Sequence, residues 1–232
     1  MKRGTKPKGK ISTDWSSKLA YAIGLITADG CLSIDGRHID LTSKDMEQIV
    51  SYQKCLNITN KISPKYSGRG DLSYHTAFGD VIFYQFLVSI GLTPHKSNTI
   101  SSVDIPDKYF FDFLRGYFDG DGSSYSYNDP RYPNSYRFYI SFTSGSATYL
   151  NWLRGSLRRL LNINGFVCHN KNNSYPQLKY SKTEAVIFCD KMYLNSEIPS
   201  LERKRLKIEA SLCIIDKCRG GEIGRHARFR CV

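Results

Sequence analysis

Two acidic residues in repeated surroundings are the strongest candidates for chemistry in this 232-residue chain. Asp29 stands next to last in Ala22–Gly30 (AIGLITADG), and Asp121 stands next to last in Leu114–Gly122 (LRGYFDGDG). Each stretch reads as an apolar helix that ends in an acid followed by a glycine. Two carboxylates brought to the same end of a packed helix pair would suit a metal ion that prefers oxygen ligands.

Small residues at fixed spacing indicate how two such helices could approach each other. Gly24 and Ala28 are four residues apart in the first stretch, as are Gly116 and Gly120 in the second. Positions i and i+4 share one face of a helix, so these residues predict a helix–helix interface with the two backbones in contact. Glycine inside a helix costs about 1 kcal/mol relative to alanine, and close packing must offset that cost.

Charge and composition favour a polyanionic partner. Lys and Arg outnumber Asp and Glu by 33 to 21, which gives a net charge of +12, and 16 residues are tyrosine. Basicity of this size joined to so much tyrosine favours nucleic acid. No apolar run reaches the ~20 residues of a membrane helix, and no apolar segment follows the basic N-terminus as it would in a signal peptide. We therefore expect an intracellular protein with no membrane partner.

The cysteines do not form a metal-binding pattern. None of the seven lies in a Cys-x-x-Cys pair, and no histidines cluster with them. This spacing argues against a structural zinc site. Reduced thiols are the default inside cells, so we expect free cysteines, with cytoplasm and organelle both left open as the compartment.

Hydrophobic periodicity predicts the same order of elements twice. In the first half it predicts a helix up to Asp29, a hairpin, a second helix, two more strands and a third helix, over 14–29, 31–42, 46–56, 62–66 with 72–78, and 80–90. Alternation in the first hairpin assigns one apolar face to Leu32, Ile34, Ile39 and Leu41. The second half repeats the plan, with the motif aspartates 92 residues apart. The sequence therefore predicts an internal duplication with the order αββαββα in each half.

This order divides the chain into four expected parts. Residues 1–13 form a basic N-terminal arm, residues 14–103 the N-terminal half, and residues 104–215 the C-terminal half. Residues 216–232 have no apolar period, and we expect them to be a disordered tail.

The duplicated motif, each copy followed by hairpin, helix, hairpin and helix, resembles the single-chain LAGLIDADG homing endonucleases over about residues 14–215. The resemblance implies an α+β fold of two pseudo-symmetric halves, in which the motif helices pack at the interface and two antiparallel sheets form a DNA-binding saddle. It also implies an intron-encoded monomer that cleaves both strands of a long, non-palindromic DNA target by metal-dependent phosphodiester hydrolysis.

The same resemblance implies a metal site. Asp29 and Asp121 match the metal-binding acids of the family, and the backbone carbonyls of Ala28 and Gly120 would complete the coordination. The expected cofactor is Mg²⁺, which is held in proteins by carboxylates together with substrate phosphates; Mn²⁺ or Ca²⁺ could occupy the same sites.

Four further positions match family residues around the reaction centre. Lys96 and Lys204 match basic residues that orient water or stabilise charge on phosphate, and a phosphate-contacting or solvated lysine is the alternative. Asp40 and Ser141 match polar residues at the inner strand ends that organise solvent.

The two motif copies are not identical. Thr27 stands where the second copy has Asp119. Because the metal role belongs to the later acid, cleavage is not put in doubt, but a structural role of Asp119 should be absent or altered at Thr27. This asymmetry and the unequal hairpin loops predict two different half-sites.

The polar faces of the predicted sheets are the candidate DNA-reading surfaces, since a two-stranded ribbon fits the major groove and arginine or lysine can read guanine there. For each candidate, a phosphate or solvent contact is as good an interpretation as base readout. The candidates are Arg37, His38, Lys65, Arg69, His75, Arg131, Arg137, Tyr139, Lys171 and Lys179.

Two other functions stay open at this point. An RNA maturase of the same fold would assist the splicing of its own intron RNA without needing to cleave DNA. A DNA-binding regulator would have lost catalysis. The presence of both Asp29 and Asp121 favours the nuclease.

Overall fold

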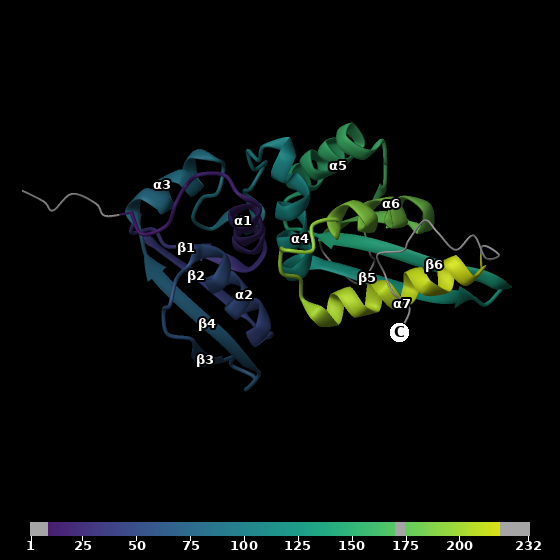
Figure 1. Ribbon diagram of the computed structural model, residues 1–232, viewed down its shortest axis with the longest axis horizontal. Coiled ribbons are helices and arrows are strands. Elements are labelled where there is room, and N and C mark those ends of the chain that lie inside the picture. The colour runs from purple at the N-terminus through teal and green to yellow at the C-terminus, as the bar shows by residue number, and fades with distance from the viewer. Residues whose placement is uncertain (1–8, 170–174, 219–232) are drawn as a thin grey trace, which may run out of the picture. The chain divides into compact units, whose positions relative to one another are not determined.

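The computed structural model describes residues 9–169 and 175–218, which form two compact units. Unit 1 spans Met1–Gly120 and unit 2 spans Asp121–Val232. The division falls at the end of the second motif helix, because that helix packs against the first one (Figure 1). Two calls lie largely outside the described residues: most of the predicted arm, and the tail beyond residue 218.

Unit 1 contains one four-stranded antiparallel sheet with the strand order β1-β2-β4-β3. Helices α1 and α2 pack against it, and α3 and α4 follow in the chain (Figure 1). Its elements are α1 (Ser17–Asp29), β1 (Gly30–Leu32), β2 (His38–Ser43), α2 (Met46–Leu56), β3 (Ser63–Tyr66), β4 (Leu72–Gly79), α3 (Val81–Ser89), the 3₁₀ turns η1 (Lys96–Asn98) and η2 (Asp107–Tyr109), and α4 (Phe110–Asp121).

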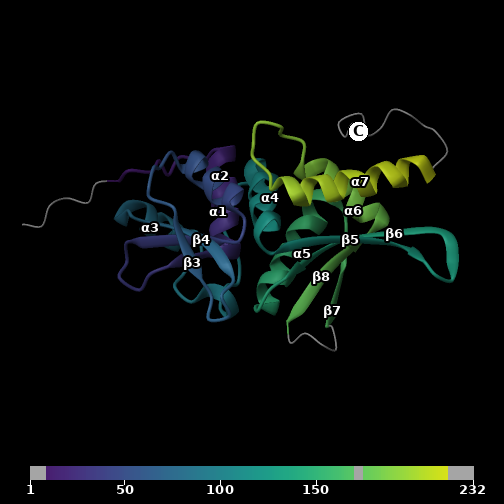
Figure 2. The same ribbon diagram turned by 90° about the horizontal axis from the view of Figure 1, so that it is seen from below.

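Unit 2 repeats the arrangement with the strand order β5-β6-β8-β7. Helices α5, α6 and α7 contact one face of this sheet (Figure 2). Its elements are β5 (Gly122–Asp129), β6 (Tyr132–Thr143), α5 (Ala147–Leu161), β7 (Phe166–His169), β8 (Pro176–Ser181), α6 (Lys182–Met192) and α7 (Glu202–Cys218). The predicted α+β fold, with two antiparallel sheets and a duplicated element order, is confirmed.

Alternation along the strands determines which sheet face is buried. Ile39 and Leu41 on β2 are fully buried, as are Phe138, Ile140 and Phe142 on β6. Successive side chains of a strand point to opposite faces, so the intervening polar residues form an outer face on each sheet. Ile34 departs from the predicted alternation and is 80% exposed, because β1 ends at Leu32 and Ile34 lies in the turn.

Two local features differ from expectation or extend beyond it. Helix α7 continues to Cys218. Its side chains Ile208, Leu212 and Ile215 are buried on one side of the helix. Cys213 is disulfide-bonded, so the expectation that all thiols are reduced is wrong, although Cys55 and three other described cysteines are free.

Within the described residues, no helix is both long and apolar enough to span a membrane.

The last residues of the predicted N-terminal arm are held by a helix cap. The side chain of Asp80 caps α3 by accepting from the Phe83 amide, and its other oxygen accepts from the amides of Lys10 and Ile11 at 2.6 and 3.1 Å. Ile11 is only 6% exposed. The chain is therefore fixed to unit 1 from Lys10 onward.

Helices α1 and α4 touch backbone to backbone. A Cβ atom added to Gly24 would lie 2.6 Å from the Tyr117 nitrogen and 2.9 Å from the Gly116 Cα, and one added to Gly116 would lie 3.1 Å from the Leu25 nitrogen. One turn further on, a Cβ on Gly120 would collide with the Cβ of Ala28. Residue numbers rise together along these contacts, so the helices are parallel and their C-terminal ends lie together.

The contact between α1 and α4 contains a polar pair that the repeat does not duplicate. The Tyr21 hydroxyl donates to the Asp119 carboxylate at 2.8 Å, and Asp119 is 1% exposed. Burial and the neighbouring carboxylate raise the pKa of Tyr21 well above its usual value. The corresponding residues are Phe113 and Thr27; phenylalanine cannot donate, and Thr27 instead donates to the Ile23 carbonyl of its own helix at 2.8 Å.

Gly116→Ala should destabilise unit 1. We expect the free energy of unfolding to fall by about 1–3 kcal/mol, the usual cost of overpacking, even though alanine favours helix more than glycine does. The matched control is Gly155→Ala inside α5, where an added Cβ meets no atom within 4 Å; there, stability should rise by about 0.5–1 kcal/mol. Urea denaturation measures both changes, and stabilisation by both variants would contradict the close approach of the helices.

The Tyr21–Asp119 hydrogen bond should appear as a coupling energy. Tyr21→Phe alone should cost about 1.5–3 kcal/mol, because it removes a donor from a buried carboxylate. The double variant Tyr21→Phe/Asp119→Thr copies the Phe113/Thr27 combination and should cost less than the sum of the single variants, by about 1 kcal/mol or more. A double-mutant cycle by thermal or urea unfolding checks this, and additive single costs would contradict it.

Candidate metal site and nucleic-acid interface

Each motif aspartate is the last residue of its helix, and the strand of a sheet begins directly after it. Asp29 ends α1 and is followed by Gly30, the first residue of β1; Asp121 ends α4 and is followed by Gly122, the first residue of β5. An acid at a helix C-terminus is disfavoured by the macrodipole. These two positions therefore require an explanation other than helix stability.

The Asp29 carboxylate is held by a residue of α2. The amide nitrogen of Gln48 donates to Asp29 Oδ2 at 3.2 Å, while Gln48 Oε1 accepts from the Ser43 hydroxyl at 2.8 Å. Ser43 thereby fixes which end of the Gln48 amide faces Asp29. Because Gln48 is only 2% exposed, this orientation is built into the core of unit 1.

The glycine of the second motif leaves room for this carboxylate. A Cβ on Gly120 would stand 2.9 Å from Asp29 Oδ2. Gly120 precedes Asp121 in the chain, so the small residue that permits helix contact also admits the Asp29 carboxyl group beside the end of α4. Residues Ala28 and Gly120 are both partly exposed at this end of the helix pair.

A lysine approaches the chain directly after each aspartate. Lys96 Nζ, on η1, donates to the Gly30 carbonyl, and Lys204 Nζ, on α7, donates to the Gly122 carbonyl at 2.7 Å. Lys96 is 6% exposed. The two contacts correspond between the halves although the lysines come from unlike elements, a 3₁₀ turn and a long helix.

The predicted solvent-organising residues lie on the neighbouring strand in both halves. Asp40 on β2 pairs with Cys31, two residues after Asp29, and Ser141 on β6 pairs with Ser123, two residues after Asp121. The hydroxyls of Ser123 and Ser141 lie 2.8 Å apart. The two positions correspond in register but differ in chemistry, with a carboxylate in one half and a hydroxyl pair in the other.

Each motif helix ends in a carboxylate, a type of ligand that suits a small, hard divalent cation. Asp29 supplies a partly exposed carboxylate in the space that Gly120 leaves open, and Asp121 supplies an exposed one at the end of α4. Among the described residues, no three or more His, Cys, Asp or Glu side chains gather into a metal-binding group. A protein that offers few carboxylates suits Mg²⁺, which keeps several waters and takes substrate phosphate oxygens as further ligands.

The predicted DNA-contacting residues are spread over the outer faces and turns of the two sheets. Sheet A (β1–β4) carries His38, Lys65 and His75 on its strands, and sheet B (β5–β8) carries Arg137, Tyr139 and Lys179. Arg37, Arg69 and Arg131 lie in exposed turns, and Lys171 lies outside the described residues.

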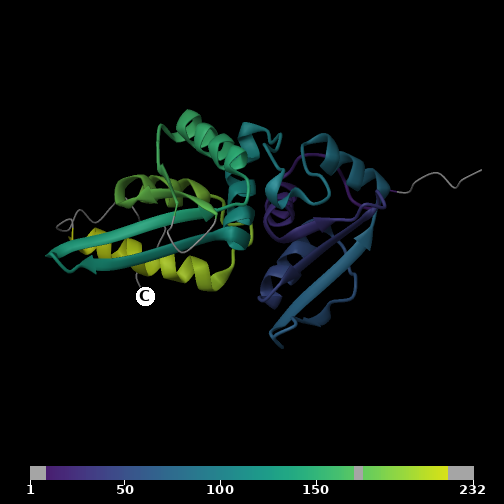
Figure 3. The same cartoon turned by 180° about the vertical axis from the view of Figure 1, so that it is seen from behind.

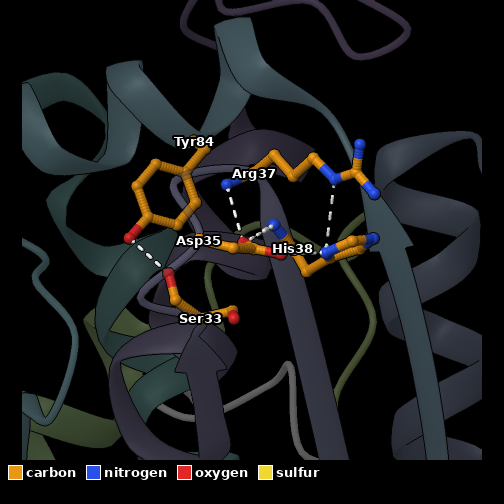
Figure 4. Close-up of polar contacts among 5 residues, drawn as sticks. All are labelled: Ser33, Asp35, Arg37, His38 and Tyr84. Carbon is orange, nitrogen blue, oxygen red and sulfur yellow. Dashed lines mark hydrogen bonds and ion pairs between the residues drawn. The ribbon is translucent and has the colours of Figure 1, made fainter.

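The β1–β2 turn is organised by an aspartate (Figure 4). Asp35 Oδ1 accepts from the backbone amides of Arg37 and His38 at 3.1 and 3.0 Å, while Asp35 Oδ2 pairs with His38 Nδ1. The His38 contact holds the pKa of Asp35 well below its usual range. Tyr84 of α3 fastens the same turn by donating to the Ser33 carbonyl at 2.7 Å.

The β5–β6 turn uses the same device. Asp129 Oδ1 accepts from the Arg131 amide at 3.0 Å, and Asp129 Oδ2 accepts from both Nε and Nη2 of Arg137, at 3.3 and 3.1 Å. Each hairpin thus holds one basic side chain against a turn aspartate. Both aspartates were missed from the sequence, although Asp followed within a few residues by a basic residue in a turn was a usable signal.

Gln48 and two tyrosines are further residues that sequence reasoning missed. Gln48 is polar at a core position of α2, and that misplacement in the helical pattern was the available signal. Tyr125 and Tyr127 lie on the outer face of β5, where their rings stack with Tyr139 at centroid distances of 4.9 and 6.4 Å. Their period-two spacing was an available signal for a shared face, but it does not indicate which partners the rings meet.

Comparison with known proteins agrees with this arrangement. Residues 110–193 match the family model for the LAGLIDADG-like domain. The chain is similar in structure to the homing endonuclease I-WcaI bound to its DNA recognition sequence, with a TM-score of 0.62 and 15% identity over 89% of this chain and 95% of that one. A search of curated proteins finds no match.

Two further solved structures show how widely the fold occurs. The meganuclease I-SmaMI bound to uncleaveable DNA has a TM-score of 0.55 and 14% identity, over 89% of this chain and 99% of that one. Full-length DUF199/WhiA from Thermatoga maritima has a TM-score of 0.52 and 18% identity, over 94% of this chain and 66% of that one.

At these identities the structural matches establish the fold, and the family model matches the segment that begins at the second motif helix. The resemblance predicted from the duplicated motif is confirmed. Residues 110–193 match the LAGLIDADG-like domain model, and the chain has the fold of the single-chain LAGLIDADG homing endonucleases.

Proposed function

We propose that the chain is a site-specific DNA endonuclease that hydrolyses both strands of a long, non-palindromic duplex target in a Mg²⁺-dependent reaction. One observation carries the proposal: each half ends its motif helix in an aspartate and brings a lysine to the carbonyl of the residue that follows. Because the fold also occurs in DUF199/WhiA, which is not described as an endonuclease, fold alone does not assign cleavage.

The aspartates would serve as ligands shared with the substrate. A bound divalent cation supplies Lewis-acid polarisation of the scissile phosphate and a water of lowered pKa. Asp29 would present one carboxylate oxygen in the orientation set by Gln48, and Asp121 would present its carboxylate from the end of α4.

The lysines would act on charge at the phosphate. The ammonium groups of Lys96 and Lys204 each donate to the backbone carbonyl of the residue that follows a motif aspartate. A cation fixed in a water-poor position stabilises negative charge that develops in the transition state more strongly than a solvated one does. Lys96, at 6% exposed, is the more desolvated of the pair.

Differences between the halves support a non-palindromic target. Gln48 holds Asp29 from the first turn of α2, three residues after the N-cap Asp45, and the residue at the same distance from the N-cap Ser146 of α5 is Tyr149. The outer faces of the sheets also carry different side chains. Two unlike halves would read two unlike half-sites.

Cleavage should depend on both motif aspartates. We expect purified wild-type protein with Mg²⁺ to cut a defined site in a randomised duplex library, and chelation by EDTA to abolish cutting. Asp29→Asn and Asp121→Asn should each slow cleavage by about a thousand-fold, since metal-assisted stabilisation is worth several kcal/mol and 1.36 kcal/mol is tenfold. Their affinity for the same duplex should change little.

Glu197→Gln is the matched control, because it removes an exposed carboxylate outside the site and should leave the cleavage rate unchanged. If the wild-type protein cuts no duplex but binds its own intron RNA tightly, the maturase replaces the nuclease. If it binds a specific duplex without cutting it, the DNA-binding regulator replaces the nuclease.

Gln48→Leu should weaken the metal site in one half only. Leucine is of similar size and removes the amide that orients Asp29. Residues that orient metal ligands typically contribute 10–100-fold to affinity or activity, so the Mg²⁺ concentration for half-maximal cleavage should rise about tenfold. Nicking assays should show that one strand is cut more slowly than the other, and equal slowing of both strands would contradict this role.

A further inference from the structure

The outer face of sheet B carries an aromatic stack. Tyr125 and Tyr139 lie directly opposite each other on β5 and β6, with ring centroids 4.9 Å apart and planes inclined by 15°. Tyr127 stacks on Tyr139 from the diagonal position at 6.4 Å, again at 15°. We call these three residues the tyrosine ladder.

Among the described residues of unit 2, no helix covers the ladder. Helices α5, α6 and α7 lie on the opposite face, which buries Phe138 and Ile140 and brings Ser211 of α7 to Ser126 of β5 at 3.2 Å. Figure 3, seen from behind, shows β5 and β6 in front of α6 and α7. Tyr127 is 46% exposed, and the other two rings are half-buried by each other.

Basic side chains flank the ladder and fit a polyanion. Lys179 Nζ lies 5.5 Å from the Tyr125 ring centroid at one end. Arg137 lies directly opposite Tyr127 at the other end, held by Asp129. Apolar rings between two cations suit a DNA groove, where phosphates border an interior of base edges.

The ladder lacks the groups that recognise most bases. Guanine is recognised in the major groove by arginine or lysine, adenine by asparagine or glutamine, and thymine by apolar contact with its C5-methyl group. None of the three tyrosines carries an amide, ammonium or guanidinium group. The ring edges therefore remain as the main recognition surface.

Sheet A does not repeat this feature. The paired residues on its outer face include His38, Asp40, Thr42, His75 and Ala77, and among the described strand positions of that face none carries a phenyl or phenol ring. The tyrosine ladder is therefore a feature of sheet B that the outer face of sheet A lacks in the described strands.

We propose that the tyrosine ladder selects thymine, through its C5-methyl group, in the major groove of the half-site that sheet B contacts. The proposal rests on the proposed DNA-binding function and specifies the chemistry of one half of the target. The half-site recognised by sheet A would be insensitive to that methyl group.

Thymine-to-uracil replacement tests this directly, since it removes the methyl group and keeps every base-pairing and groove hydrogen bond. The target found in the library is resynthesised with single uracils at each thymine, and binding is measured with Ca²⁺ to prevent cleavage. Uracil at one or more positions of one half-site should weaken binding about fourfold per methyl group, the value of burying one methylene-sized group. Uracils in the other half-site should have no effect.

Tyrosine variants assign the effect to the ladder. In Tyr139→Ser the uracil penalty should disappear at the sensitive positions, whereas Tyr139→Phe should keep it because the ring remains. His75→Ala, on the outer face of sheet A, should leave the penalty unchanged whatever it does to affinity.

Two outcomes overturn the proposal: no position is sensitive to uracil, or the penalty persists in Tyr139→Ser. Loss of the penalty in Tyr139→Phe also overturns it, since the hydroxyl would then be the contact. Failure to bind any duplex DNA would instead overturn the proposed function, so the two failures are distinguishable.

Discussion

Close contact between the backbones of α1 and α4 is the constraint on which the site depends. Gly24 and Gly116 lie where any side chain would strike the opposite backbone, and Gly120 meets Ala28 and the Asp29 carboxylate at the end of the pair. Glycine is unfavourable inside helices, but here its absence of a side chain allows two helix ends to lie together. A carboxylate at the C-terminus of a helix costs stability, and the proposed cation site would be a physical reason to keep it.

The two halves share a plan and differ in the groups that complete it. Both bring a lysine to the carbonyl after the motif aspartate, from a 3₁₀ turn in one half and from α7 in the other. In the first half Gln48 orients Asp29, and the cross-helix pair of Tyr21 and Asp119 joins a tyrosine to a buried carboxylate where the repeat has Phe113 and Thr27. Duplication thus supplied the framework, and later divergence at core positions made the halves chemically unequal.

Divergence is greater still on the outer sheet faces. Sheet A presents small and polar side chains, whereas sheet B presents stacked tyrosines between two cations. Both hairpin turns nevertheless use an aspartate to hold a basic side chain. A side chain that is already held in place loses less conformational entropy when it binds a partner. A common support for unlike recognition surfaces is consistent with one chain that contacts two unlike sequences.

The sequence by itself determined the repeated αββαββα order, the buried strand faces and the small-residue interface, because these follow from periodicities of two and 3.6 and from the size of single residues. It also indicated Asp29, Asp121, Lys96 and Lys204 through the resemblance. Only tertiary structure decided that Gln48 holds Asp29, that Asp129 holds Arg137 and that three tyrosines stack, since each contact joins elements whose register the local sequence does not specify. Ile34 marks the same limit: alternation assigned it to the core, and the end of β1 placed it in solvent.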